Sequence, residues 1–265
     1  QSTYFLSFGY MDQRSNFVGP DKGQKRYNYR LNMTNEFGKL KLTSMLNYVR
    51  RETTDHSSST GTLMVDANRV PLIYKQKDSL GRYLTNDVLQ QFNSLGILEE
   101  GGFRKYDDDN VFGNLQAEFS ITDDFKIRGV FGGALYSNHV YGRTMQVNFL
   151  PKGVYGANRN TYDESRKSID LNTQFIAEYN KTIAERHSIN VLIGASNENH
   201  SDRGTGIYKT LTDSDLGTPI TETVVSPDSY TSNQSSSENS LNSLFGRASY
   251  AFNQKYFAEF SFRYD

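Results

Sequence analysis

The chain of 265 residues contains no cysteine, no tryptophan and only 5 prolines. Without cysteine it can form no disulfide framework and offers no thiolate for catalysis or metal binding. No apolar run approaches the roughly 18 to 20 residues of a transmembrane helix, so a helical membrane protein is excluded. A net charge of −1 provides no concentrated basic surface, which argues against a nucleic-acid partner.

Aromatic residues are abundant instead. They make up 13% of the chain, with 18 tyrosines and 17 phenylalanines, although hydrophobic residues as a whole reach only 36% and the mean hydropathy is −0.66. Such values do not exclude a transmembrane β-barrel, because only every second residue of each strand meets lipid while the lumen and the loops are polar.

Strict alternation of apolar and polar residues predicts β-strands of about ten or more residues, longer than the five or six typical of soluble sheets. In the closing stretch, Tyr256, Phe260 and Phe262 share one face, while Glu259 and Arg263 share the other. The predicted strands are 3–12, 26–34, 39–50, 110–121, 125–136, 168–180, 188–196 and two strands within 243–265, on either side of Asn253-Gln254-Lys255.

The connections between these strands alternate in length. Long connections are predicted at about 13–24, 51–109, 137–166 and 197–240, and short ones at 35–38, 122–124, 181–187 and 253–255. In an up-and-down antiparallel sheet this order puts every short turn at one end. A soluble β-sandwich shows the same strand periodicity but has no reason to sort its connections by length, whereas outer-membrane barrels have short periplasmic turns and long external loops.

A barrel in lipid must close, because every backbone polar group has to be paired there. The pattern gives nine strands, an odd number, and the last one stops at Asp265 without a turn. Single-chain bacterial barrels have an even number of strands. We therefore predict an all-β fold that forms an internal part of a large antiparallel transmembrane β-barrel, with residues 1–265 as one partial barrel domain.

Four sequence segments resemble those of a known family: YFLSFGYMDQ, RYNYRLNM, VFGNLQAEFSITDDFKIRG and LFGRASYAFNQKYFAEFSFRYD. The chain resembles the SusC/RagA family of TonB-dependent outer-membrane transporters over essentially all its strands, whereas its loops match no recognised pattern. The resemblance implies a barrel of about 22 strands, an N-terminal plug domain, a TonB-binding segment and a SusD-like surface lipoprotein. Neither the plug nor the TonB-binding segment is found within these residues.

The function expected from the resemblance is active nutrient import across the outer membrane of a Gram-negative bacterium, with an oligosaccharide or another nutrient as ligand. The expected partners are outer-membrane lipid, a SusD-like lipoprotein and the TonB system, which would act through the plug. The alternative is a non-transporting surface protein that serves as an adhesin or a glycan-binding module. No cofactor is expected.

Aromatic residues in the predicted long loops are the candidates for ligand binding. Flat rings beside planar hydrogen-bonding groups suit the capture of glycans or peptides, although loop-core packing is the expected role of most of these rings. The candidates are Tyr74, Tyr83, Phe103, Tyr106, Tyr155, Tyr162, Tyr208 and Tyr230.

The alternation of apolar and polar residues predicts two further groups of side chains. Tyrosines on the apolar faces are expected to form an interfacial girdle, and polar residues on the opposite faces are expected to line the lumen. The girdle candidates are Tyr4, Tyr10, Tyr27, Tyr48, Tyr179, Tyr256 and Tyr264; the lumen candidates are Asn28, Arg30, Asn114, Gln116, Glu118, Asn172 and Gln174.

No pattern in the sequence indicates an enzyme. The glycines Gly129, Gly132 and Gly133 lie inside a predicted strand, which is the wrong context for a phosphate-binding loop. The histidines show no metal-ligand spacing and are expected to be ordinary solvated side chains; they are His56, His139, His187 and His200. The acidic run Asp107-Asp108-Asp109 is expected to be solvated rather than a Ca²⁺ site. Residues 86–98 predict a short helix in the longest loop, stopped at Gly96.

Overall fold

The computed structural model describes residues 1–19, 21–85, 93–210 and 230–265, except for the side chains of residues 230–232. Most of these residues belong to β-strands. The strands of the main sheet are β1 (Ser2–Arg14), β2 (Gly23–Phe37), β3 (Leu40–His56), β4 (Gly102–Ser120), β5 (Phe125–Thr144), β8 (Asn160–Ile183), β9 (His187–Thr210), β10 (Tyr230–Phe252) and β11 (Tyr256–Tyr264). The remaining elements are the short strands β6 (Val147–Asn148) and β7 (Val154–Tyr155) and the helices α1 (Thr60–Arg69) and α2 (Ser94–Glu100).

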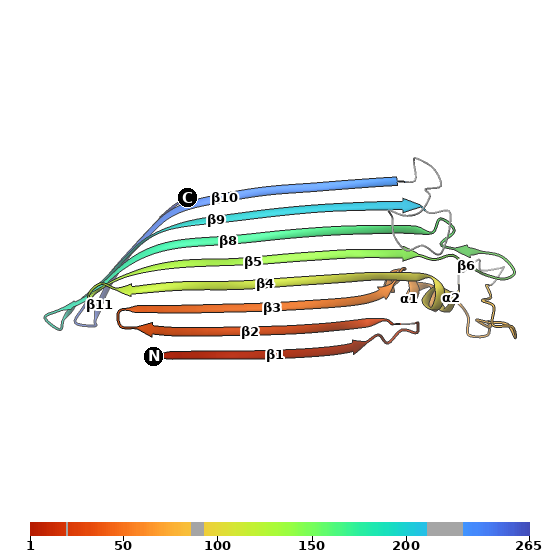
Figure 1. Ribbon diagram of the computed structural model, residues 1–265, viewed down its shortest axis with the longest axis horizontal. Helices are drawn as coiled ribbons and strands as arrows, with labels where there is room; N and C mark the ends of the chain where they lie inside the picture. Colours follow the sequence, from red (N-terminus) through yellow and green to blue (C-terminus); the bar gives the residue numbers. More distant parts are fainter. Residues whose placement is uncertain (20, 86–92, 211–229) are drawn as a thin grey trace.

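The main sheet has nine strands in the order β1-β2-β3-β4-β5-β8-β9-β10-β11, and every pair is antiparallel. Consecutive strands of this sheet are thus always neighbours in space. Figure 1 shows the short turns gathered at one end of the sheet and the long connections, with α1, α2 and β6, at the other. The predicted all-β fold with connections sorted by length is confirmed.

Several strands are much longer than the alternation predicts. Strands β8 and β9 have 24 residues each, and β10 has 23. At about 3.3 Å per residue, 24 residues extend roughly 80 Å, far beyond the apolar band of about 25 Å in a barrel. The prediction that 137–166 and 197–240 are loops was therefore wrong for most of their described residues. Both faces are polar there, so alternation disappears although the hydrogen-bonded ladder continues.

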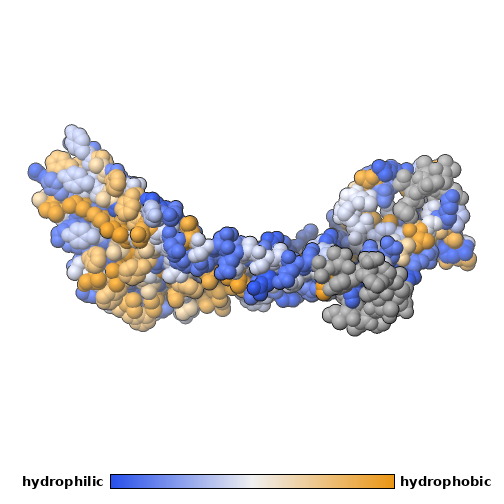
Figure 2. Space-filling model, turned by 90° about the horizontal axis from the view of Figure 1, so that it is seen from above, coloured by the Kyte–Doolittle hydropathy of each residue, from blue (hydrophilic) through white to orange (hydrophobic). Residues whose placement is uncertain are grey.

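One face of the sheet is apolar across all nine strands at the end of the short turns. In β1 to β3 the cross-strand row is Leu6, Leu31 and Leu46, and the next residue of β1 begins the opposite row, Ser7, Arg30 and Asn47. Leu6 is 74% exposed, because no protein element covers it. Figure 2 shows hydrophobic residues massed at this end and hydrophilic ones over the middle of the strands. An uncovered apolar face of this extent fits contact with lipid.

Tyrosine rings mark where the apolar band gives way to charge. The rings of Tyr10 and Tyr27 face each other across β1 and β2 with centroids 5.2 Å apart. Two residues further toward the long connections, the same face carries Asp12, Lys25 and Glu52. All seven predicted girdle tyrosines lie on this face, and all seven predicted lumen residues lie on the opposite one.

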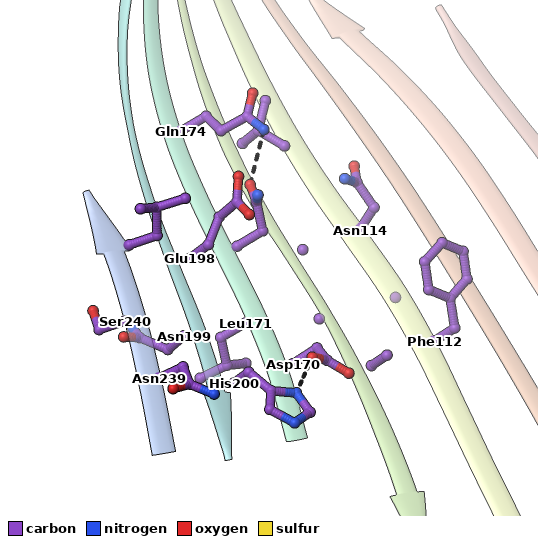
Figure 3. Close-up of a pocket in the computed structure, with 17 residues that line it drawn as sticks. Phe112, Asn114, Asp170, Leu171, Gln174, Glu198, Asn199, His200, Asn239 and Ser240 are labelled. Carbon is purple, nitrogen blue, oxygen red and sulfur yellow. Dashed lines mark hydrogen bonds and ion pairs between the residues drawn. The ribbon is translucent and has the colours of Figure 1, made fainter. Parts of the chain in front are cut away.

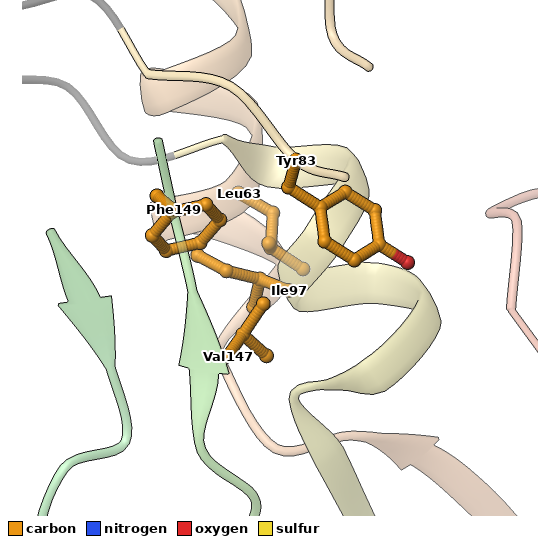
Figure 4. Packing of buried hydrophobic residues seen from close by; sticks show 5 residues of the cluster. All are labelled: Leu63, Tyr83, Ile97, Val147 and Phe149. Carbon is orange, nitrogen blue, oxygen red and sulfur yellow. The ribbon is translucent and has the colours of Figure 1, made fainter. Parts of the chain in front are cut away.

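The hydrophobic core lies outside the sheet, between the long connections. Figure 4 shows Leu63 of α1, Tyr83, Ile97 of α2, Val147 of β6 and Phe149 packed together. Each of these side chains is at most 6% exposed. Residues 57–85 and 93–101 of one connection and 145–159 of another, far apart in the sequence, are thereby joined into one small folded unit.

The predicted helix at 86–98 is found only in part, since 86–92 lie outside the described residues. Helix α2 begins at Ser94, with the Asn93 side chain accepting the Gly96 N–H at 3.1 Å. Gly96 therefore does not stop the helix. A Cβ at this position would lie 2.9 Å from the Tyr83 ring, so glycine allows α2 to approach that ring. Neither helix in the described ranges is long and apolar enough to cross a membrane.

Substitution of Leu46 with arginine tests the lipid-facing assignment. Leu46→Arg puts a charge on the apolar face, and such a charge costs about 2–4 kcal/mol near the middle of a bilayer. We expect the complete protein to lose stability by this order in denaturant titration of the bilayer-inserted form. Asn47→Arg, one residue along β3 on the polar face, is the matched control and should change stability little. Equal losses in both variants would contradict the assignment.

Candidate functional site

The polar face of the sheet contains a hollow over β4, β5, β8, β9 and β10. It has a volume of about 640 Å³, and its lining side chains include Asn114, Gln174, Glu198 and His200 (Figure 3). Gly132 forms part of its floor, where a Cβ would lie 3.4 Å from Nδ2 of Asn114. The three glycines of β5 thus lie in a strand, as predicted, and Gly132 leaves open space on this face.

Two hydrogen-bonded pairs lie within the hollow. Gln174 donates to Asn172 at 2.9 Å, and Nδ1 of His200 lies 2.6 Å from Oδ1 of Asp170. These contacts join side chains of neighbouring strands or of the same strand face. These two pairs orient four of the polar side chains of the hollow.

A second constellation lies on the same face, nearer the long connections. The guanidinium carbon of Arg104 is 5.4 Å from the ring centroid of Tyr106 and 5.1 Å from that of Tyr162. Tyr162 stacks on Tyr208 with centroids 6.1 Å apart and ring planes 27° apart. The hydroxyl of Tyr208 donates a hydrogen bond to Glu164. We call these five residues the arginine–tyrosine cluster.

Strand register brings this cluster together from segments distant in sequence. Arg104 of β4 pairs with Gly142 of β5, Gly142 with Tyr162 of β8, and Tyr162 with Tyr208 of β9. Gly142 has no side chain to fill the space between Arg104 and Tyr162. A Cβ there would lie 2.6 Å from Cζ of Tyr162, so the ring of Tyr162 covers the glycine and reaches the guanidinium.

The cluster has a defined protonation state. Burial raises the pKa of Tyr162, and the nearby Arg104 opposes this only in part. The hydrogen bond to Glu164 raises the pKa of Tyr208, and burial adds to the shift. Both phenols therefore remain neutral at physiological pH.

The structure sorts the eight predicted ligand-binding aromatics into different environments. Tyr106, Tyr162 and Tyr208 come together in the arginine–tyrosine cluster, on strands rather than in loops. Phe103 also lies on a strand, but on the opposite face, where it contacts Tyr141 with centroids 6.3 Å apart.

The other four candidates lie in or near the long connections. Tyr83 is in the hydrophobic core, its hydroxyl donating to Glu99 and Glu100, and Tyr155 packs against that core. Tyr74 is 40% exposed. The side chain of Tyr230 lies outside the described residues.

One histidine departs from expectation. His56 is not solvated but only 2% exposed, with its ring 5.8 Å from that of Phe17 in an edge-on arrangement. Because the end of β3 is covered by the connection from β1, its position in the chain gives no signal of this burial. Burial lowers the pKa of His56, and the neighbouring ammonium of Lys22 lowers it further.

Two further histidines and two residues of the acidic run form pairs with other side chains. Nε2 of His139 lies 3.0 Å from Asp163, and Nδ1 of His187 lies 2.6 Å from the Tyr250 hydroxyl. The acidic run of β4 is divided between the two faces of the sheet: Asp109 pairs with Arg50, whereas Asp108 accepts from Asn138. Within the described ranges, no three His, Asp or Glu side chains are grouped to hold a metal ion.

Sequence reasoning missed Arg104, Gly142 and Glu164. They lie where both faces of the strands are polar, so no periodic pattern marks them. Their proximity follows from strand pairing between residues about 20 to 60 positions apart, and the only available signal was the group of aromatics at 103–106 and 162.

Comparison with solved structures agrees with the fold. The chain is similar to chains in the structure of the RagAB peptide transporter (19% identity, TM-score 0.75) and in the RagAB peptide importer in its closed-closed state (18%, 0.78) and open-open state (20%, 0.74). Each match covers 99% of this chain but only 29–30% of the other, so the chain spans less than a third of their length. No protein-family model and no curated protein sequence matches. The fold is that of part of a large antiparallel transmembrane barrel.

The burial of His56 gives a pH-dependent prediction. Above its unfolded pKa of 6.5, the ring is neutral in both states and the end of β3 keeps its full stability. As the pH falls below 6.5, the unfolded segment gains a proton that the folded one resists, so stability decreases down to the lowered folded pKa. We expect intrinsic-rate-corrected hydrogen exchange around residues 15–19 and 54–56 to increase from pH 7.5 to 5.5. The His56→Gln variant should show a much flatter response; an unchanged response would contradict the assignment.

Gly142 gives a test of the cluster's construction. Gly142→Ala should push the Tyr162 ring away from Arg104 and weaken binding of any ligand held there by several fold. Gly129→Ala is the matched control, because a Cβ at Gly129 of the same strand meets nothing within 4 Å. Ligand titration of the two variants would show the difference, and equal affinities would indicate that Tyr162 needs no such space.

Proposed function

We propose that this chain forms part of the barrel wall of an active nutrient importer in the outer membrane of a Gram-negative bacterium. The observation that carries the proposal is the continuous apolar face of nine paired strands. It lies opposite a polar face that contains the hollow and the arginine–tyrosine cluster. The likeness to chains of a peptide importer supports it. Energy for transport would come from the inner membrane through TonB, acting on a plug domain.

The ligand class we propose is an oligomeric nutrient with repeated hydrogen-bonding groups. The sequence favours an oligosaccharide, and the peptide named for the similar structures is the second class. Amide and carboxylate side chains across the hollow, such as Asn114, Gln174 and Glu198, can bond to the hydroxyls of a glycan or to peptide groups. Their regular spacing along the strands suits a ligand that moves past them.

We further propose that a SusD-like lipoprotein sits over the long connections. The segment between α1 and Tyr83 exposes apolar side chains at this end of the sheet: Leu72 is 103% exposed, Ile73 85% and Leu80 74%. Exposed apolar groups on a unit that is itself well packed are typical of a protein contact. The ordered core around Ile97 would provide the firm base for such a partner.

Energy dependence tests the importer. Cells expressing the complete protein should accumulate fluorescent oligosaccharides or peptides, and deletion of TonB should abolish accumulation while surface binding remains. Cells without the protein control for background uptake. Accumulation that persists without TonB would refute the mechanism, and TonB-independent surface binding with no accumulation would instead indicate the adhesin or glycan-binding alternative.

A further inference from the structure

We propose that Arg104 binds a carboxylate group of the transported ligand, so that the arginine–tyrosine cluster selects acidic ligands. This inference rests on the proposed function, because it assumes that the polar face of the sheet is the path of a ligand. It goes further by naming the charge of that ligand and the residue that recognises it. The free carboxylate could belong to a peptide C-terminus or to a uronic acid unit of an oligosaccharide.

The first argument is that, among the described residues, Arg104 is paired with no acidic side chain, whereas Arg128 and Arg166 of the same face are. Arg166 pairs with Asp202 at 2.9 Å, and Arg128 pairs with Glu178 at 2.9 Å. Among the described residues Arg104 makes no ion pair, and its Nε is buried without a hydrogen-bond partner. A half-buried charge without a counter-ion destabilises the fold. Such charges therefore tend to occur where they have a function, such as ligand binding.

Two carboxylates on the same face as Arg104 accept hydrogen bonds from other groups. Asp55 pairs with Arg104 in the β3–β4 register, but its Oδ1 accepts the backbone N–H of His56 at 2.8 Å. Glu164 accepts the hydroxyl of Tyr208. Neither forms an ion pair with the guanidinium, which leaves it able to pair with a carboxylate of a ligand.

The second argument is that the guanidinium is held in place. The rings of Tyr106 and Tyr162 engage it at 5.4 and 5.1 Å, which stabilises the charge through cation–π attraction. Such contacts use the ring faces and leave N–H groups of the guanidinium able to donate. A planar carboxylate can accept two parallel N–H bonds from arginine, a geometry that lysine does not offer.

The side chains around Arg104 suit the part of the ligand beyond its carboxylate. Tyr162 and Tyr208 are stacked 6.1 Å apart and offer an aromatic surface beside the cation. That surface can cover the apolar face of a sugar ring or an aliphatic side chain. Glu164 accepts the Tyr208 hydroxyl through Oε1, so its Oε2 can accept a hydroxyl or an N–H from the ligand.

The position of the cluster is also suitable. Arg104 precedes Asn114, which lines the hollow, by ten residues on the same face of β4 and toward the long connections. A ligand entering from that end would meet the arginine before the hollow. The cluster would therefore act as the first selective contact.

Matched probes test the proposal with the complete protein in detergent. The first pair is trigalacturonic acid and its methyl ester; the second is acetylated pentaalanine with a free carboxylate and the same peptide as an amide. We expect the acid of at least one pair to bind about tenfold or more tightly than its neutral form, because charge-assisted bidentate bonds are lost. The pair that shows the difference identifies the source of the carboxylate.

Variants then assign the effect to Arg104. Arg104→Gln should remove the preference for the acid, and Arg104→Lys should restore it only in part. Arg166→Gln is the matched control, since Arg166 is on the same face but already paired with Asp202. The preference of this variant for the acid over the neutral form should stay within about twofold of that of the wild-type protein. Heat-modifiable electrophoretic mobility would show that each variant is folded.

Three results would overturn the proposal: no binding of either acid to the wild-type protein at millimolar concentration, equal binding of acids and neutral forms, or an unchanged preference in folded Arg104→Gln. These results are independent of the importer test, because binding in detergent requires no TonB. TonB-independent accumulation would refute the importer while a preference lost in Arg104→Gln would still establish the carboxylate site.

Discussion

The antiparallel ladder of backbone hydrogen bonds is the constraint on which the rest of the structure depends. Nine strands pair in chain order, and because side chains alternate between faces, a single register fixes the environment of every residue. A shift of one residue between two strands would move Leu31 from the apolar row to the polar one. Lipid contact, lumen lining and the arginine–tyrosine cluster are therefore all consequences of one pairing scheme.

The same ladder continues where lipid contact has ended. Strands β8, β9 and β10 extend well past the last residues of the apolar band, and the cluster is built on such extensions of β4, β8 and β9. A ligand site on paired strands is more rigid than one on a loop, since each residue is held by hydrogen bonds on both sides. Binding there would lose less conformational freedom than binding to a disordered loop.

The long connections are stabilised by packing of their own side chains. Residues from 57–85, 93–101 and 145–159 have no lipid to cover their apolar groups, so they form a separate core around Leu63, Ile97 and Phe149. The arrangement keeps one end of the sheet ordered by ordinary packing while the other end depends on the membrane. It also leaves apolar groups such as Leu72 and Ile73 unburied.

The sequence by itself determined the strands that cross the apolar band, their inward and outward faces and the end at which each connection lies. In that band every second residue meets lipid, so the environment is recorded in the alternation, as in Tyr256, Phe260 and Phe262. The tertiary structure alone decided the strand extensions, the burial of His56 and Tyr83, and the meeting of Arg104 with Tyr162. Those features arise where both faces are polar or where distant segments pack together, and neither condition leaves a periodic mark in the sequence.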